Sequence, residues 1–417
     1  MTDQPVTIGA SAKANSDYGL QLNRWFLKPI GVWPTFPSTT RFEKIVSITL
    51  NVICYTSILL TTIPCLVRMF LEDESIYLKL KSLGPVSHWV VSGANYTTLL
   101  LRSKDIRQCM EHMEADWQTV TREKDQWVML KNAKFGRYVA ASCAIFMQSG
   151  VMCFIFVTAM DTVEIQVGNE TRILHVLPCA VYKTLINVDE SPTNEIVLFL
   201  QAWCTIIANS STVGMFSLAA VLAAHACGQL NVVMVWITEF VNEPKKTDGP
   251  KGIGVIVERH LRTLNVLVNS VTMLRDNCSF IGYIEKLMNR VYFLEIFRCT
   301  MNICILGYYI LSEWADQNVQ SLVTYIMIYI SIGFNVFLIC YIGEILTEQS
   351  KKVGEVVYMT NWYYLPDKTI LDLILIIARS GVVVQITAGK MVHMSVYTFG
   401  DVVKTGFAYL NLLRQMT

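Results

Sequence analysis

Two opposite charges, Asp401 and Lys404, lie three residues apart in an otherwise apolar stretch near the carboxyl end of the chain. A charged side chain inside a bilayer must face water or pair with another charge, so such residues are candidates for a hydrated path through a membrane. Positions i and i+3 are also neighbours on a helix, which makes a local ion pair the alternative. The pair therefore indicates either contact with water or a self-contained salt bridge.

The same stretch carries five residues at helical spacing: Thr405, Ala408, Tyr409, Leu412 and Met416. The spacing i, i+3, i+4, i+7 and i+11 places them on one face of a helix. If four copies of the chain brought such faces together, Leu412 and Met416 would form an apolar ring that closes a pore by excluding water. Ordinary packing between helices is the alternative, because apolar residues at this spacing usually belong to a core.

Motifs for enzymatic chemistry are missing from the sequence. It contains no HExxH, GxSxG or GxxxxGK[ST] motif and no GxGxxG motif after a strand. The six histidines are isolated from one another: His88, His112, His175, His225, His260 and His393. We therefore expect no catalytic residues, no metal site and no cofactor.

The twelve cysteines include no CxxC pair and mostly occupy apolar contexts. This is the pattern of small buried hydrophobic residues rather than of a disulfide framework. One bridge remains open, between Cys65 near the end of an apolar run and Cys179 in a long polar segment.

Composition places these features in a membrane protein. The 417 residues are 53% hydrophobic and 16% charged, with a mean hydropathy of +0.41, and so much apolar surface must face lipid. No dense basic patch points to nucleic acid. Apolar runs of about 20 residues predict seven transmembrane helices, at 45–67, 76–100, 136–160, 194–222, 292–312, 320–346 and 391–413.

Lysine and arginine are distributed unevenly around these spans. The side of the amino terminus holds five before the first span, eight in 102–137, eight in 228–290 and five in 351–390, which makes 26. The other side holds three in 68–81, two in 161–193, none in 313–319 and one at Arg414, which makes six. The positive-inside rule then predicts a cytoplasmic amino terminus and an extracellular carboxyl terminus.

Residues 369–389 form an eighth apolar run, which would return the carboxyl end to the cytoplasm. Asp372, Arg379 and Gln385 interrupt this run, and basic residues flank it. A charge at the middle of a bilayer costs roughly 2.5–3.5 kcal/mol. A buried helix in a cytoplasmic bundle therefore explains the run better than a span.

The remaining segments complete an all-α integral membrane protein with an intracellular helical anchor bundle. Residues 1–44 lack the apolar core of a cleavable signal peptide and form a cytoplasmic segment, whose part 20–34 is either an interfacial helix or a disordered tail. Transmembrane helices 1–6 are expected in 45–346, with cytoplasmic extensions at 102–135 and 224–291 and an outer loop at 161–193. A cytoplasmic anchor helix is expected in 347–390, and the seventh, pore-lining helix in 391–417. The helical pattern that starts near 253 runs to 312. The outer loop carries a glycosylation sequon at Asn169.

Several motifs of this sequence resemble those of the insect odorant receptors. They are Gly31-Val-Trp-Pro34, His225-Ala-Cys-Gly-Gln-Leu230, Cys340-Tyr-Ile-Gly-Glu-Ile-Leu-Thr-Glu-Gln-Ser350, Tyr358 with Trp362-Tyr-Tyr-Leu-Pro366, Ala378-Arg-Ser380, Thr387-Ala-Gly-Lys390, and the tail from Phe399 through Lys404-Thr405 to Tyr409-Leu-Asn-Leu-Leu413. The likeness covers the whole chain and is densest from residue 340 onward.

The resemblance implies a function as well as a fold. Members of this family are subunits of four-subunit, non-selective cation channels that small hydrophobic volatiles open, in the plasma membrane of olfactory sensory neuron dendrites. They usually work with a shared odorant receptor co-receptor, which has a long cytoplasmic insertion after its fourth span. The corresponding connector here, Val241 to Gly254, is short. The chain therefore resembles a tuning subunit, and Leu412 occupies the position of the family's gate residue.

One part of the sequence departs from the family pattern. The final helix of the family commonly reads Ser-Tyr-Ser-Tyr where this chain has Gly406-Phe-Ala-Tyr409, so details of the pore that depend on hydroxyl groups do not carry over. Gustatory relatives, the nearest alternative, end with a Thr-Tyr and Gln-Phe signature that this chain lacks.

The family arrangement also implies an apolar ligand cavity in the outer half, between the second, third, fourth and sixth spans. The expected lining is Leu83, Gly84, His88, Met147, Gly150, Phe154, Trp203, Ile207, Tyr325 and Tyr329. In the third span, Met147, Gly150 and Phe154 share one helical face, where Gly150 is expected to leave room for a ligand. Plain packing between helices is the alternative for each of these residues.

Two other classes compete with a channel. A G-protein-coupled receptor needs an extracellular amino terminus, and neither an Asp-Arg-Tyr motif after the third span nor an Asn-Pro-x-x-Tyr motif in the last one is present. A secondary transporter would usually show related halves with interrupted helices, and none is evident. Both are weaker explanations of the sequence than a ligand-gated channel.

Overall fold

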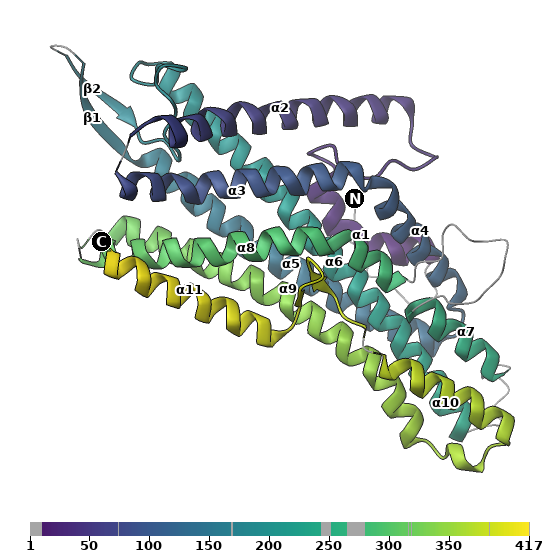
Figure 1. Ribbon diagram of the computed structural model, residues 1–417. Helices are drawn as coiled ribbons and strands as arrows, with labels where there is room; N and C mark the ends of the chain where they lie inside the picture. Colours follow the sequence, from purple (N-terminus) through teal and green to yellow (C-terminus); the bar gives the residue numbers. More distant parts are fainter. Residues whose placement is uncertain are drawn as a thin grey trace.

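The computed structural model describes residues 11–73, 75–167, 170–242, 252–264, 280–315, 317, 319–382 and 384–416. Figure 1 shows long helices side by side, with two small hairpins. The elements are α1 (Ala12–Leu27), α2 (Arg41–Leu71), α3 (Ile76–Leu101), α4 (Ser103–Thr119), α5 (Glu123–Met160), β1 (Thr162–Val167), β2 (Glu170–His175), α6 (Thr193–Asn242), α7 (Ile253–Leu264), α8 (Phe280–Ala315), α9 (Val319–Met359), a 3-10 turn (Trp362–Tyr364), α10 (Asp367–Gly381), β3 (Thr387–Ala388), β4 (Val392–His393) and α11 (Val396–Met416).

Five helices among the described residues are long and apolar enough to cross a membrane: α2, α5, α6, α8 and α9. The predicted all-α membrane class is therefore confirmed. The predicted second and seventh spans correspond to α3 and α11, which lie alongside the other helices (Figure 1) but carry more polar residues, including Lys79 and Lys81 in α3 and Asp401 and Lys404 in α11. The count of seven spans and their orientation stay predictions.

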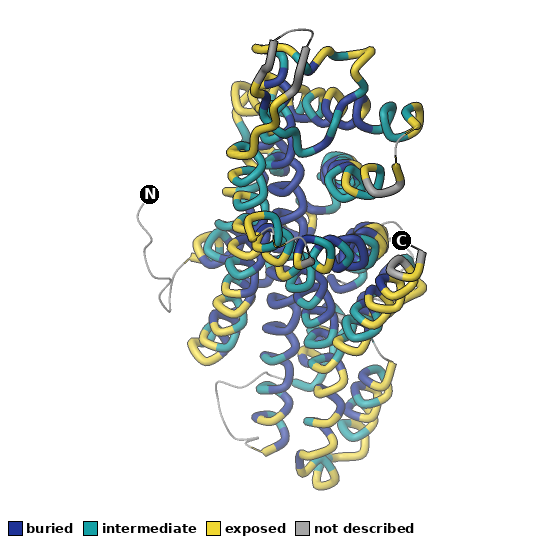
Figure 2. The backbone as a smooth tube through the Cα atoms, turned by 90° about the vertical axis from the view of Figure 1, so that its left-hand side faces the viewer, coloured by how far each residue is buried: buried dark blue, intermediate teal, exposed yellow. Residues whose placement is uncertain are grey.

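Helix α6 is the centre of the fold. Its 50 residues correspond to about 75 Å at 1.5 Å per residue. Of its most apolar stretch of 18 residues, 89% is buried. Figure 2 shows this helix as a dark-blue column through the molecule. A helix that is apolar all round must be covered on every side, and α5, α9, α1, α3 and α2 provide that cover.

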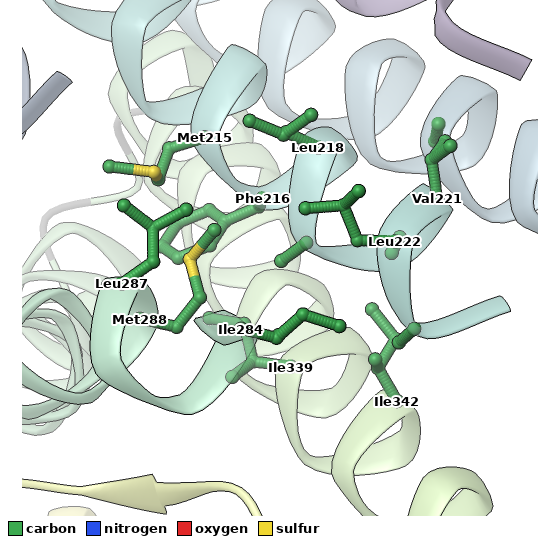
Figure 3. Close-up of a cluster of buried hydrophobic side chains, with 14 of the residues drawn as sticks. Met215, Phe216, Leu218, Val221, Leu222, Ile284, Leu287, Met288, Ile339 and Ile342 are labelled. Atoms are coloured by element: carbon green, nitrogen blue, oxygen red, sulfur yellow. The ribbon is translucent and has the colours of Figure 1, made fainter. Parts of the chain in front are cut away.

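Small residues on α6 let its neighbours approach closely, as they do in membrane helix pairs generally. A Cβ atom added to Gly214 would lie 2.3 Å from Leu27 of α1, and one added to Gly136 of α5 would lie 2.7 Å from Ala224. Larger side chains fill the space toward α8 and α9. Figure 3 shows part of this buried cluster, in which Met215 and Phe216 lie beside Leu287 and Met288 of α8, and Ile339 and Ile342 come from α9. Val221 lies on another side of α6, near Gly19 of α1.

Buried polar residues join α6 to the helices around it. Asn23 of α1 donates from Nδ2 to Ser217 Oγ at 2.9 Å, and Trp89 of α3 donates from Nε1 to Thr205 Oγ1 at 3.0 Å. Each bond removes a polar group that hydrocarbon would otherwise leave unpaired, so these contacts specify how the apolar helices align.

Charged side chains hold the helices together at the end that is predicted to be cytoplasmic. Asp116 of α4 lies 3.1 Å from His225 Nε2 and 3.0 Å from Arg262 Nη2 of α7. Burial by itself would raise the pKa of Asp116, but the hydrogen bond with His225 and the charges of His225, His112 and Arg262 outweigh it and lower that pKa. The carboxylate therefore links α4, α6 and α7 in its ionised form.

The segment 347–390 differs from the single anchor helix that we expected. Helix α9 continues to Met359, a 3-10 turn follows at Trp362–Tyr364, and α10 begins at Asp367. Pro366 fixes where α10 begins, because it is the N-cap of that helix, with a ψ of 144°, and proline disfavours the helical conformation in the residue before it. Leu373 and Ile376 of α10 are buried against the bundle, whereas Leu371 and Leu375 on its other face are exposed.

The last helix begins later than expected, at Val396 instead of 391. The residues before it form the short hairpin of β3 and β4, in which Thr387 pairs with His393 and Ala388 with Val392. Gly389 adopts a φ of +64° in the turn, a conformation that glycine adopts without strain, and its N–H donates to the Asn289 carbonyl of α8 at 3.0 Å. The hairpin thereby attaches the start of α11 to α8.

Two further expectations concern the segments between helices. Thr162–Val167 and Glu170–His175 of the outer loop pair as the antiparallel strands β1 and β2, where we had expected a loop. The sequon asparagine, Asn169, lies outside the described residues. The helical pattern from 253 to 312 is present as α7 and α8, and residues 265–279 between them are likewise outside the described part.

A glycine substitution tests the packing of α9 against the hairpin. A Cβ atom added to Gly343 would lie 2.4 Å from the Met394 carbonyl oxygen, and backbone cannot move away as a side chain can. We expect Gly343→Ala to lower the melting temperature of the detergent-solubilised receptor by several degrees. Gly333→Ala on the same helix is the control, because no atom of the described residues outside its own stretch of helix backbone lies within 4 Å of its added Cβ. Equal melting temperatures for the two variants would contradict this packing.

His260 of α7 predicts a pH dependence of stability. Burial and the charge of Arg379 lower the pKa of His260 to about 4, so the folded state holds this ring neutral while the unfolded chain takes up a proton below about pH 6.5. Stability is therefore fully present above that value and falls by at most about 1.4 kcal/mol per pH unit from this group as the pH drops toward 4. Melting curves at pH 7.5 and 5.5 should show a smaller difference for His260→Gln than for the parent, and an unchanged difference would refute this role.

Candidate functional site

A cavity of about 160 Å³ lies between α3, α5, α6, α8 and α9. The described residues that line it are Lys81, Gly84, Pro85, His88, Trp89, Met147, Gly150, Val151, Phe154, Pro178, Thr205, Asn209, Arg298, Asn302, Ile305, Leu306, Tyr309, Tyr325, Ile328, Ser331, Ile332 and Asn335. Most are apolar or aromatic, and a few are polar, which is the usual composition of a small-molecule site. A dry apolar cavity of roughly 150 Å³ is large enough for benzene, so this one has room for a small organic molecule.

The structure brings together six of the ten residues that we predicted to bind ligand. Gly84, His88, Met147, Gly150, Phe154 and Tyr325 all line the cavity. The other four, Leu83, Trp203, Ile207 and Tyr329, are not among the residues of its lining: Trp203 is 42% exposed, and Ile207 belongs to the buried core. The role of all ten in binding a ligand stays a prediction.

Gly150 contributes to the cavity in a different way from the one expected. A Cβ atom added there would lie 2.9 Å from Ser331 Cβ of α9, and the Ser331 hydroxyl donates to the Phe146 carbonyl at 3.0 Å. The glycine therefore brings α9 close to α5 instead of leaving open space. The cavity wall at this point is the contact between Gly150 and the Ser331 side chain.

A buried ion pair neutralises the one guanidinium on the described wall. Arg298 donates to Glu295 Oε2 from Nη2 at 2.6 Å and from Nε at 2.9 Å, and these two side chains are 4% and 0% exposed. Asn95 Nδ2 donates to the other carboxylate oxygen at 2.8 Å. Removing one partner of such a pair typically costs several kcal/mol, since a buried charge is left uncompensated.

Several lining residues were missed in the sequence analysis, above all the polar ones. Arg298 and Asn302 of α8 and Asn335 of α9 occupy predicted spans, and an intramembrane polar residue is a candidate for function by default. That signal was present for Arg298. Asn335 and the aromatic Tyr309 carry no local pattern that separates them from ordinary packing.

The outer end of the cavity is covered by the chain that follows the β1–β2 hairpin. Pro178 lines the cavity, and the next residue is held from both sides by Gln201 of α6: the Cys179 N–H donates to Gln201 Oε1 at 3.0 Å, and Gln201 Nε2 donates to the Cys179 carbonyl at 2.7 Å. Gln201 Nε2 also lies 3.8 Å from Cys65 Sγ. The two cysteines considered for a bridge thus meet at one amide group, and both are free thiols in this structure.

One face of helix α11 packs against the rest of the chain, and another face does not. Val402, Gly406 and Leu410 form the packed face, where a Cβ on Gly406 would lie 2.6 Å from Ile303 of α8. The predicted stripe occupies the other face: Thr405, Ala408, Tyr409 and Leu412 are all exposed, the last two at 54% and 52%. The side chain of Met416 is outside the described part.

The two charges of α11 form only a loose pair. Lys404 Nζ lies 3.9 Å from Asp401 Oδ1, and the side chains are 77% and 47% exposed. An exposed pair at this distance contributes little. Both charges therefore stand on the surface of the single chain, next to the stripe.

These features define a class: an α-helical membrane protein with a small internal cavity and a helix at its edge whose free face is partly polar. The family model described as 7tm Odorant receptor matches residues 75–407. Among curated proteins, Odorant receptor 83a of Drosophila melanogaster is 24% identical over 133 residues, which are 32% of this chain and 29% of that protein. Odorant receptor 82a of the same organism is 32% identical over 100 residues, 24% of this chain and 26% of that protein. The matched stretches span about a third or less of these relatives.

Solved structures agree over almost the whole chain. The insect olfactory receptor OR5 from Machilis hrabei in complex with eugenol has a TM-score of 0.75 at 14% identity, over 97% of this chain and 98% of that one. A second structure of the same receptor has a TM-score of 0.75 over 96% of this chain and 100% of that one. The fold is therefore shared although the sequences have diverged.

The chain belongs to the insect odorant receptor family, as its motifs indicated. It is a multi-pass membrane protein of a family of receptors rather than of enzymes. The family match also decides against the G-protein-coupled receptor, transporter and gustatory alternatives.

The Gln201 contacts lead to a prediction about the cover of the cavity. Gln201→Leu keeps the size of the side chain but leaves the Cys179 N–H and carbonyl without their partners, so we expect the chain around 176–181 to open more often. Hydrogen–deuterium exchange of the purified receptor should be at least several-fold faster in this segment. Glu195→Gln is the matched control, because Glu195 on the same helix accepts an exposed bond from Ser191 Oγ at 2.9 Å. Unchanged exchange in Gln201→Leu would show that other contacts hold the cover.

Proposed function

We propose that this chain is an odorant-binding subunit of a ligand-gated, non-selective cation channel that works with the odorant receptor co-receptor. The observation that carries the proposal is the free face of α11, where Thr405, Ala408, Tyr409 and Leu412 are exposed in the single chain. A stripe of this kind next to an exposed charge suits the wall of a water-filled path shared between subunits. Four such helices around one axis would bring Leu412 and Met416 together as an apolar gate.

Helix α8 supports a mechanism that connects ligand and gate. Leu306 lines the cavity, and the next residue, Gly307, faces α11, since its added Cβ would lie 3.1 Å from Leu410. Adjacent residues of one helix thus touch the ligand space and the pore helix. A ligand that prefers a displaced position of α8 would move α11 with it, and only that preference between states, not the contact itself, opens the channel.

The size of the cavity sets the class and affinity of the ligand. A volatile molecule that buries about 200 Å² gains roughly 5 kcal/mol at ~25 cal/mol/Å², which corresponds to a dissociation constant on the order of 10⁻⁴ M. A small hydrophobic odorant that binds with moderate affinity fits both the size of the cavity and this dissociation constant. The complex of the Machilis receptor with eugenol supports a ligand of similar size here.

The proposed setting follows from the same family. The chain would reside in the plasma membrane of olfactory sensory neuron dendrites, as a heterotetramer with the co-receptor. Its amino terminus would be cytoplasmic and its carboxyl terminus extracellular, which agrees with the distribution of 26 against six basic residues. Asn169 would then be available for glycosylation on the outer side.

Substitution of the gate residue tests the function. Leu412→Ser places hydroxyl groups in the apolar ring, so we expect the ring to stay wet and the ligand-free current to rise several-fold in cells that express the chain with its co-receptor. Whole-cell recording in cells without functional G proteins measures this current.

Phe407→Ala is the control for that experiment. Phe407 is also exposed, at 52%, but lies roughly 140° from Leu412 around the helix at 100° per residue. It should leave the ligand-free current unchanged. If Leu412→Ser conducts and gates like the parent at equal surface expression, Leu412 is not the gate; if no odorant evokes current in any variant, the channel function itself is wrong.

A further inference from the structure

Two cysteines from distant parts of the chain meet at the cover of the cavity. Cys65 belongs to α2, and Cys179 belongs to the segment between β2 and α6. Their side chains lie within hydrogen-bonding range of each other, and the two residues are 1% and 2% exposed. The structure therefore brings together the two residues whose pairing the sequence left open.

One amide side chain fixes the position of both cysteines. The Cys179 N–H donates to Oε1 of Gln201 at 3.0 Å, and Nε2 of Gln201 donates to the Cys179 carbonyl at 2.7 Å. The same Nε2 lies 3.8 Å from Cys65 Sγ. The backbone of one cysteine is thus held beside the sulfur of the other, and such proximity is the first requirement for a disulfide bond.

A third cysteine nearby has a different partner. Cys204 follows Gln201 on α6 and is fully buried, but its side chain hydrogen-bonds to Thr61. Thr61 precedes Cys65 by about one turn of α2, so Cys204 and Thr61 meet one turn further along α2 than Cys179 and Cys65. Cys65 and Cys179 are therefore the pair that this arrangement places together.

The position of the pair along the molecule sets its redox environment. The β1–β2 hairpin and the carboxyl terminus lie at one end of the molecule, and α10 lies at the opposite end (Figure 1). Cys179 comes shortly after the hairpin, so the proposed extracellular carboxyl terminus puts the pair on the outer side. During synthesis that side faces the lumen of the endoplasmic reticulum, where neighbouring thiols are oxidised, whereas cytoplasmic thiols stay reduced.

We propose that Cys65 and Cys179 form a disulfide bond in the mature receptor, which ties the segment after β2 to α2. Formation breaks both S–H bonds and makes one S–S bond: two protons are released, and two electrons pass to the disulfide of a secretory-pathway thiol oxidoreductase, which becomes a dithiol. The structure shows the two residues before this step, as thiols. The inference rests on the proposed function only for the orientation of the chain. Two small buried side chains in ordinary packing are the competing explanation.

The bond would act on the cover of the cavity and on the stability of the bundle. Pro178, next to Cys179, lines the cavity, so a link at Cys179 restrains the cover. The loop that the bond closes contains α3 and α5, and closing a long loop restricts the unfolded chain and stabilises the folded one. Because both sulfurs are buried, a soluble reductant reaches the bond only after unfolding.

Peptide mapping of the parent protein tests the bond directly. The full-length receptor, purified with its co-receptor, is unfolded in denaturant that contains iodoacetamide, so that free thiols are blocked, and it is then digested without reductant. We expect mass spectrometry to find a linked pair of peptides that contain Cys65 and Cys179 and that separate on reduction. Fragmentation distinguishes Cys65 from Cys54 on the same helix. Alkylated Cys65 and Cys179 in the parent, without a linked pair, would overturn the inference.

Serine variants then separate a bond from ordinary packing. Cys65→Ser and Cys179→Ser each remove the same bond, so we expect each to lower the melting temperature by several degrees and the double variant to lower it little further. Additive shifts, as two independent packing residues give, would contradict the bond. Cys204→Ser is the matched control, because it changes a buried cysteine of the same cluster and should retain the linked peptides.

Hydrogen–deuterium exchange shows whether the bond holds the cover. Exchange in 176–181 should be several-fold faster in Cys65→Ser than in the parent. Gln201→Leu should accelerate it more in the Cys65→Ser background than in the parent, since the amide then holds the segment alone. Equal exchange in Cys65→Ser and the parent would contradict a bond at this position.

These outcomes are independent of the channel function. A linked pair in a receptor that no odorant opens would leave the disulfide bond intact and contradict the channel function. Free thiols in a receptor that conducts in response to an odorant would do the reverse. A linked pair of Cys65 with Cys204 in the parent would overturn the pairing proposed for Cys179.

Discussion

The fold depends on close packing around one helix, α6, in which every residue from Ile207 to Leu230 is buried. Lipid provides no hydrophobic force between helices, so association in a membrane relies on contact, and contact requires small residues where backbones meet. Helix α6 meets this requirement along its length: Gly214 touches Leu27, and Ala224 touches Gly136. The five helices around it take their positions from those contacts, and the cavity is the space left where their side chains do not fill the gap.

Different forces hold the two ends of the same bundle. Within the apolar part, single hydrogen bonds such as Trp89 to Thr205 align the helices. At the end predicted to be cytoplasmic, α6 continues into a region where ion pairs such as Asp116 with Arg262 and Glu239 with Arg122 connect α4, α5, α6 and α7. The carboxylates of Asp116 and Glu239 are tolerated there although their side chains are only 7% and 8% exposed, because each has more than one basic partner. The cavity lies in the apolar part of the bundle, away from these ion pairs.

The sequence predicted the class and the long helices, because both rest on patterns that lipid imposes over 20 residues or more. The expected position of the cavity came from the resemblance to the family. The sequence predicted the ends of individual helices less accurately, because single residues determine them. The start of α11 depends on the positive φ of Gly389 and its bond to Asn289, and the break before α10 on Pro366. Signals for both were present, and so was the alternation of Val163-Glu-Ile-Gln-Val167 that marks the outer hairpin. Asn335 could not be found in this way, because no local pattern separates an asparagine that lines a cavity from one in ordinary packing.

The polar side chains around the cavity connect its wall to neighbouring parts of the fold. Glu295 receives bonds from both Arg298 and Asn95, and the Gln201 amide binds the Cys179 N–H and carbonyl and lies 3.8 Å from Cys65 Sγ. A molecule that binds one arrangement of this wall better than another stabilises the arrangement that it prefers. Since α8 forms both the cavity wall and the support of α11, a change in the preferred position of that wall reaches the face of α11 that carries Leu412.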